Sequence, residues 1–179
     1  MKLAGSNIVQ TVDISTGEPW RGSLETLFEK YAANVTYKPG VDILCPDDVR
    51  ITDWTGWSRI VTIHRIHADH LQWMKVNVYD QSVICTSDSE LLEWQDAEFR
   101  RVFQGRPVWQ YKCIALGDVT PESRGRCFCY NHPSFFDNYI IEPIDHDRTV
   151  YYEIYTQSKF YNVNRIVDAS IGYEEKGWR

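Results

Sequence analysis

The sequence predicts an all-β fold, mainly antiparallel, with one or two short helices. Short runs rich in β-branched and aromatic residues recur between turn-forming residues along most of the chain. Only one stretch has the apolar spacing of a helix, and strands do not alternate with helices as they do in βαβ folds. The 179 residues are enough for one domain with its own core.

The first forty residues predict a strand, a helix and a loop. The run at 8–14 is strand-like and ends in a turn at 15–17. Apolar side chains then recur at the i, i+3, i+4 and i+7 positions of a helix, after Ser23 as a plausible N-cap: Leu24, Leu27, Phe28 and Tyr31. A polar loop is expected at 32–40.

The remaining elements are expected to be mostly strands. Runs at 49–53 and 57–66 flank a turn at 54–56, and 71–86 reads as two strands joined at 79–82. The segment 90–103 is ambiguous and partly helical in pattern. Near the end, 149–156 and 159–167 are each strand-like, with a turn around 157–158.

Composition argues against several classes of function. The formal net charge is −6, whereas a nucleic-acid interface needs clustered Lys and Arg. No apolar run approaches the ~20 residues that span a bilayer, and the first ten residues are too polar for a signal peptide. Five cysteines, an odd number, indicate reduced thiols in a cytoplasmic setting.

Two groups of potential metal ligands are expected to be structural. His64, His67 and His70 lie at the end of a strand-like run, where three-residue spacing alternates faces. The Cys-x-Cys pair of Cys127 and Cys129, near His132, does not have the spacing of a zinc finger. We therefore expect no metal and no cofactor.

Three stretches, in order, carry a resemblance to one family. They are "SNIVQTVDISTG" from Ser6, "VICTSDSELL" at 83–92, and "YYEIYTQSKFYNVNRIVDAS" at 151–170. The second is similar to a Thr-x-x-His segment of the form "VTEDHSLL", and the third to paired motifs of the form "VYDIETESHTFYANGIVVHN". The chain thus resembles an intein, a self-splicing protein insert, and the segment 52–76 is similar to inteins of phage and polymerase type.

The resemblance implies a horseshoe-like Hint fold with both splice junctions at its centre. Residues 1–5 would be the remnant of the upstream flank, 6–169 the intein, and 170–179 the remnant of the downstream flank. The segment between the motif groups is too short for a homing endonuclease domain. The partners would be the chain's own flanks, with a complementary fragment if the intein is split in the loop at 32–40, and neither nucleic acid nor a membrane.

The implied chemistry is autocatalytic cleavage and ligation of peptide bonds. Ser6 would attack the carbonyl of Gly5 in an acyl shift, and Thr86 with nearby N–H groups would stabilise the oxyanion. Ser170 would accept the acyl group, and a terminal Asn would cyclise to release the insert. A rigid scaffold contributes by holding these groups close together.

Three positions depart from the family pattern. Ser89 stands where the family has a His, and a hydroxyl cannot act as a general acid near neutral pH. Lys2, Asp88 and His67 are unranked candidates to replace it. Asp168 takes the place of the penultimate His.

Ala169 takes the place of the cyclising Asn, so it is expected to block C-terminal cleavage and keep the precursor intact. Two further positions carry roles implied by the family. Glu153 lies where members have an Asp that aids acyl transfer, and Lys159 where many have a His that assists cyclisation. Two alternatives stay open: a β-rich interaction module without chemistry, and an autoprocessing domain that cleaves only at its N-terminus.

Overall fold

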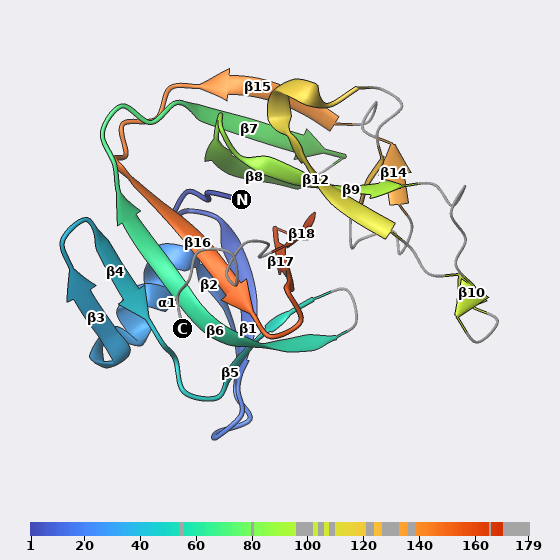
Figure 1. Ribbon diagram of the computed structural model, residues 1–179. Coiled ribbons are helices and arrows are strands. Elements are labelled where there is room, and N and C mark those ends of the chain that lie inside the picture. Colours follow the sequence, from blue (N-terminus) through green and yellow to red (C-terminus); the bar gives the residue numbers. More distant parts are fainter. Residues whose placement is uncertain are drawn as a thin grey trace.

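In the part of the chain that the structure describes, antiparallel sheets pack with one short α-helix at one side (Figure 1). The computed structural model describes residues 1–53, 56–79, 81–95, 102–103, 106–107, 110–120, 124–126, 133–135, 139–164 and 166–169. Its helix is α1 (Leu24–Lys30), with 3₁₀ turns at Ala32–Asn34 and Leu116–Asp118. None of the helices in these ranges is long and apolar enough to span a membrane.

The strands alternate with short turns along the described chain, as the sequence predicts. They are β1 (Ile8–Asp13), β2 (Pro19–Ser23), β3 (Val35–Lys38), β4 (Val41–Leu44), β5 (Val49–Thr52), β6 (Trp57–His67), β7 (Trp73–Val78), β8 (Gln81–Thr86), β9 (Glu90–Gln95), β10 (Val102–Phe103), β11 (Arg106–Pro107), β12 (Gln110–Ala115), β13 (Arg124–Arg126), β14 (Pro133–Phe135), β15 (Tyr139–Ile144), β16 (Val150–Thr156), β17 (Phe160–Val163) and β18 (Ile166–Ala169).

Strand β6 connects the two parts of the largest sheet, whose order is β2-β1-β5-β6-β4-β3. Its first residues pair with β5, and its later residues pair with β4 on one side and β16 on the other. A second sheet has the order β15-β7-β8, and β9 pairs with β12. Strand β6 thus holds β16, one of the two strands beside the N-terminal segment.

The helix α1 forms where its spacing predicts it and covers the core. The Ser23 hydroxyl accepts a hydrogen bond from the Thr26 N–H, so it is the N-cap that the sequence indicates. Leu24, Leu27 and Phe28 are buried. They join a core that includes Leu3, Ile63 and Tyr152. Apolar side chains of the helix, of β6 and of β16 are thus buried against one another.

Two expectations about elements were wrong, and a third is tested only in part. The loop expected at 32–40 contains a 3₁₀ turn and β3, because Val35–Lys38 pairs with β4. The segment expected to be partly helical begins with β9, which pairs with β12, and its residues 96–101 lie outside the described ranges. The stretch at 159–167 is two strands, because Asn164 adopts a left-handed conformation (φ 46°) and reverses the chain between β17 and β18.

Buried Asn7 joins the N-terminal segment to β8. Its side-chain Nδ2 donates to the carbonyls of Ala4 and Ile84, at 2.9 and 2.6 Å. Its Oδ1 accepts from the Ile84 N–H at 2.9 Å. Asn7 is 1% exposed, so these bonds form away from water and every polar group in them has a partner.

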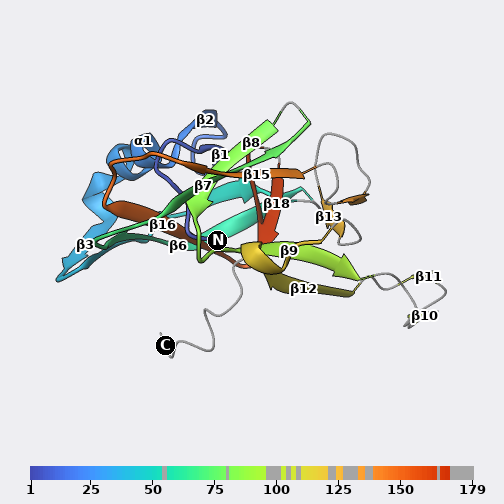
Figure 2. The ribbon, with the colours of Figure 1, turned by 90° about the horizontal axis from the view of Figure 1, so that it is seen from above.

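Asn164 extends this network to the C-terminal hairpin, β17–β18. Its Oδ1 accepts from the Ile8 N–H, and its Nδ2 donates to Asn7 Oδ1 and to the Ser82 carbonyl. Its own N–H donates to the Ile8 carbonyl at 2.8 Å. The hairpin is thereby fixed to β1 and β8, and in both views it lies near the centre of the molecule, beside the N-terminus (Figures 1 and 2).

We expect Asn7→Ala to lower the free energy of unfolding by roughly 2–4 kcal/mol, because it leaves several buried backbone groups without partners. Chemical denaturation measures the change. Gln10→Ala, which removes an exposed amide on β1 three residues further along, is the control and should change stability by less than about 0.5 kcal/mol. Equal effects of the two substitutions would show that the network does not stabilise the fold.

Candidate functional site

The N-terminal segment lies between β8 and β16 as an additional short strand. Leu3 exchanges backbone hydrogen bonds of 2.8 Å with Tyr152 and bridges Cys85 on its other side. The Ala4 N–H donates to the Ile84 carbonyl at 2.9 Å. Leu3 and Ala4 are fully buried, so this part of the segment lies in the interior of the fold, whereas Met1 and Lys2 are partly exposed.

The predicted residues Thr86 and Ser89 meet this segment at Lys2. We call Thr86, Asp88 and Ser89, at and just after the end of β8, the Thr86 turn. The Thr86 N–H donates to the Lys2 carbonyl at 3.0 Å, and the Lys2 N–H donates to Ser89 Oγ at 3.0 Å. Thr86 Oγ1 donates to Asp88 Oδ1 at 2.6 Å and lies 3.2 Å from Ser89 Oγ.

The main-chain N–H of Thr86 and the hydroxyl of Ser89 therefore hold one short stretch of backbone. Thr86 is 1% exposed and Ser89 is 2% exposed. Ser89 occupies the position where the family pattern has His, and it acts here as a hydrogen-bond partner of the backbone. A hydroxyl can fix the peptide group in place, but it does not supply the proton that an imidazolium would.

The Lys2 side chain forms an ion pair with Asp88 over the Tyr151 ring. Burial alone would lower the pKa of Lys2, but the hydrogen bond and charge of Asp88, with the charges of Tyr151 and Glu153, raise it above its usual value. Burial would likewise raise the pKa of Asp88, but hydrogen bonds from Lys2 and Thr86 and the Lys2 charge hold it below its usual range. Both groups are therefore charged at neutral pH.

Glu153 lies near this ion pair on β16, where the resemblance places a transfer-assisting acid. It is the register partner of His64 on β6, and the Tyr155 hydroxyl donates to Glu153 Oε2. The His64 ring packs against Tyr155 with centroids 4.8 Å apart, and its Nε2 lies 3.2 Å from Thr62 Oγ1. The structure thus brings Glu153 to the same region as Lys2, Thr86 and Ser89.

Ser6 does not lie at the Thr86 turn. Because Leu3 pairs antiparallel with Cys85, residues further along the N-terminal segment lie progressively earlier on β8. Ser6 is exposed in the turn that the Asn7 N–H closes on the Ala4 carbonyl. The expected contact between Ser6 and Thr86 is therefore not formed.

Gly5 has a packing role that the sequence does not indicate. It is buried, and a Cβ added to it would lie 2.9 Å from Tyr152 Cε2 and 3.2 Å from Glu25 Cβ. Its carbonyl accepts from the Glu25 N–H at 3.0 Å, in the first turn of α1. Close approach to β16 and the helix is therefore sufficient to require glycine at this position.

The described part of the C-terminal motif lies in the β17–β18 hairpin. Ala169 pairs with Phe160 and Asp168 pairs with Tyr161, and β18 packs against β8 and β9, which flank the Thr86 turn. Lys159 is an exposed turn residue with φ 66°, directly before Phe160. Ser170 lies outside the described residues.

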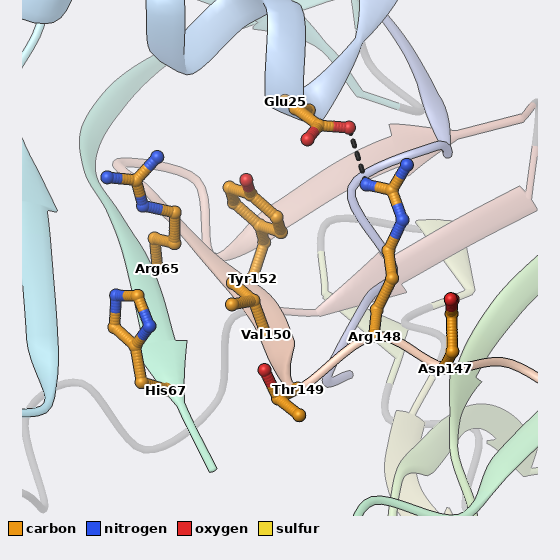
Figure 3. A pocket seen from close by; sticks show the side chains of 8 residues that line it. All are labelled: Glu25, Arg65, His67, Asp147, Arg148, Thr149, Val150 and Tyr152. Atoms are coloured by element: carbon orange, nitrogen blue, oxygen red, sulfur yellow. Dashed lines mark hydrogen bonds and ion pairs between the residues drawn. The ribbon is translucent and has the colours of Figure 1, made fainter.

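The described pocket adjoins Gly5, because a Cβ at that position would contact Tyr152, Glu25 and Arg148 of its lining, and Thr86 and Ser89 are not among its lining residues (Figure 3). Its volume is about 610 Å³, and its lining comes from α1, β6, the segment 147–149 and the start of β16: Glu25, Arg65, His67, Asp147, Arg148, Thr149, Val150 and Tyr152. Arg148 forms an ion pair with Glu25, and Arg65 donates two hydrogen bonds to Asp42. These cations are already paired with carboxylates, so the pocket has a structural explanation.

The histidines do not form a metal site. His64 contacts Thr62 and Tyr155, whereas His67 contacts Asp42, so the alternation of faces expected along this strand is confirmed. Within the described residues, no group of three or more His, Cys, Asp or Glu side chains is placed to hold a metal ion. Cys127, Cys129 and His132 lie outside those residues.

Sequence reasoning missed that Lys2 enters this site through its backbone, and that Asn7 and Asn164 position it. These contacts join residues 77 to 157 positions apart in the chain. No local spacing predicts them. The isolated polar residue Asn7, directly before an apolar run, was the one available signal, and many surface asparagines share it.

We expect Asp88→Asn to lower the free energy of unfolding by about 0.2–1 kcal/mol near pH 7, since the ion pair is partly exposed. The folded-state pKa of Asp88 is depressed, so its contribution is present above the unfolded value of ~3.9 and is lost as pH falls through the folded pKa. The folded-state pKa of Lys2 is raised, so its contribution is present below ~10.4 and is lost as pH rises through the folded pKa.

Denaturation curves of both proteins across pH 2–11 measure the difference, which should be largest between these limits. Asp69→Asn, in the exposed turn after β6, is the control. A difference for Asp88→Asn that is the same at all pH values would contradict the assigned ion pair.

Comparison with known proteins identifies the fold. No family model matches the sequence, and no curated protein matches it. Three solved structures that match each cover 94% of this chain. The transcription factor IIB Mvu mini-intein matches with a TM-score of 0.68 and 12% identity over 98% of its own chain, and an intein from a hyperthermophile with a TM-score of 0.66 and 13% identity over 98%. The Pab PolII intein matches with a TM-score of 0.62 and 12% identity over 99% of its own chain. The chain therefore has the intein fold.

Proposed function

We propose that this chain is a protein-splicing insert that acts in cis on the segments flanking it. The observation that carries the proposal is the convergence of two distant segments on the Thr86 turn. Residues 2–4 pair with β8 directly beside it, and β18 packs against β8 and β9. Protein splicing requires the two junctions of an insert to react with each other, and proximity of this kind supplies much of the rate.

The geometry supports an upstream junction at residue 1 rather than at Gly5–Ser6. The N–H that donates a hydrogen bond to Ser89 Oγ belongs to the peptide group joining Met1 and Lys2. Residue 1 therefore lies immediately beside the Thr86 turn. A Cys or Ser at position 1 would attack the carbonyl before it. Methionine has a thioether in place of a thiol and cannot make this attack.

The chain's own residues have separable roles in this reaction. Thr86 and Ser89 hold the backbone of Lys2, and the Lys2–Asp88 pair attaches the segment to the turn. Glu153 places a carboxylate near this pair. An asparagine at position 169 would cyclise, whereas Ala169 has no carboxamide, so the chain as printed is expected to stay intact.

The junction at Gly5–Ser6 is a second candidate, favoured by one contact. The Gly5 carbonyl accepts from the Glu25 N–H in the first turn of α1, and a backbone donor is what a developing oxyanion needs. Ser6 is exposed beside it. Under this assignment residues 1–5 would be the upstream flank and 6–169 the insert, with Ser170 as the second nucleophile.

A β-rich module without chemistry is the alternative for the chain as it stands. The residues Met1, Ser89 and Ala169 favour it, since none can perform the step that the family assigns to its position. If the insert functions as two fragments, the exposed tip of the β3–β4 hairpin at 39–40 is the suitable break. The complementary fragment would then be the partner, together with the flanks.

We expect the double variant Met1→Cys/Ala169→Asn, with a reporter segment fused before residue 1, to excise itself and join the reporter to Ser170. Ala169→Asn alone should show C-terminal cleavage, and Met1→Cys alone should release the reporter on addition of a thiol. Mass spectrometry identifies the joined product and distinguishes it from a product that retains residues 1–5.

Ser6→Ala in the double variant separates the two junctions. It should leave splicing unchanged if residue 1 is the nucleophile, and it should abolish splicing if Ser6 is. The absence of both cleavage and ligation from a folded double variant would contradict the proposed function and favour the module without chemistry.

A further inference from the structure

Asn162 is a buried amide without a hydrogen-bond partner among the described residues. It is 5% exposed, and neither Nδ2 nor Oδ1 has a partner there. By contrast, the amides of Asn7 and Asn164 each make several hydrogen bonds. An unpaired buried amide is unfavourable and rare in folded proteins, so it calls for a physical explanation.

The register of the C-terminal hairpin places this amide on the same face as position 169. Phe160 pairs with Ala169, and Asn162 pairs with Val167. Paired residues, and residues two apart on one strand, share a face of an antiparallel ladder. Positions 162 and 169 are therefore diagonal neighbours, with Cα atoms roughly 7–8 Å apart.

This separation matches a pair of facing carboxamides. Two asparagine side chains joined by one hydrogen bond can span a diagonal of that length. Ala169 ends at its Cβ and offers no polar atom. The missing partner of Asn162 and the missing cyclising amide thus fall on the same short piece of sheet.

We propose that Asn162 is a positioning residue for an asparagine at position 169, the residue that Ala169→Asn introduces. The Asn162 Oδ1 accepts a hydrogen bond from the side-chain nitrogen of that asparagine. It thereby directs this nitrogen towards the main-chain carbonyl carbon of the same asparagine. This assignment rests on the proposed splicing function.

In the step itself, the side-chain nitrogen forms a bond to the main-chain carbonyl carbon, and the bond from that carbon to the nitrogen of residue 170 breaks. The attacking nitrogen loses one proton, and the leaving amine gains one. Residue 169 becomes a succinimide. Asn162 is not consumed; it holds the attacking group in one rotamer.

The proposal predicts opposite effects of one substitution in two backgrounds. With Ala169 present, Asn162→Leu removes an unpaired buried amide at similar volume and should raise Tm by about 2–4 °C. With Ala169→Asn present, the same substitution removes the partner of a second buried amide and should lower Tm. A structural role of Asn162 that does not involve position 169 would give a Tm change of the same sign in both backgrounds.

The experiment compares four full-length proteins: the unsubstituted chain, Asn162→Leu, Ala169→Asn, and the double variant Asn162→Leu/Ala169→Asn. Tm is measured on fresh samples, and C-terminal cleavage is followed by mass spectrometry. We expect the double variant to cleave roughly 10-fold more slowly than Ala169→Asn, the loss expected for one hydrogen bond. Asn162→Val repeats the test if the leucine variant does not fold.

Asn34→Ala in the Ala169→Asn background is the control and should cleave at the unchanged rate, because Asn34 lies in the 3₁₀ turn after α1. Cleavage of the double variant at the same rate as Ala169→Asn would overturn the role of Asn162 while leaving the splicing proposal intact. Additive changes in Tm would overturn it as well. No cleavage of Ala169→Asn itself would overturn the proposed function.

Discussion

The arrangement of this molecule depends on a hydrogen-bond network between the buried Asn7 and the half-buried Asn164. Asn7 fixes the N-terminal segment to β8, and Asn164 fixes the C-terminal hairpin to both β1 and β8. These bonds join uncharged groups, so changes in salt or pH should have little direct effect on them. They set the register that places Lys2 beside Thr86 and β18 beside β8. The geometry of the candidate site follows from that register.

Charge contributes differently at the same site. The Lys2–Asp88 pair lies at its edge, partly exposed, and adds a pH-dependent attachment to a segment that backbone hydrogen bonds already hold. Beneath it, Thr86 and Ser89 are almost fully buried. The site therefore combines an uncharged, buried part, formed by Thr86 and Ser89, with a titratable ion pair at its edge. Loss of the charges of Lys2 and Asp88 should weaken the attachment of the N-terminal segment without unfolding the buried part.

Local sequence patterns predicted the local structure well and the contacts between distant residues poorly. The helix with its Ser23 cap, the β7–β8 hairpin and the long β6 strand follow from spacing within a few residues. Glycine before serine suggested a junction at Gly5–Ser6, yet Gly5 is explained by its approach to Tyr152 and Glu25. That approach depends on a strand and a helix that come later in the chain, so no pattern within residues 1–10 reveals it. The reversal at Asn164 was missed because a left-handed asparagine inside an apolar run looks like continuous strand.

The burial of Leu3 between β8 and β16, with β18 packed against β8, has a consequence for any protein that carries this domain internally. Leu3 and β18, which lie near the two ends of the described residues, thus both lie against β8. A host loop interrupted there keeps its two ends close together, so the loop-closure entropy of the host changes little despite an insertion of this length. The domain can thus be accommodated within a folded host, in the way that domains with adjacent termini are inserted.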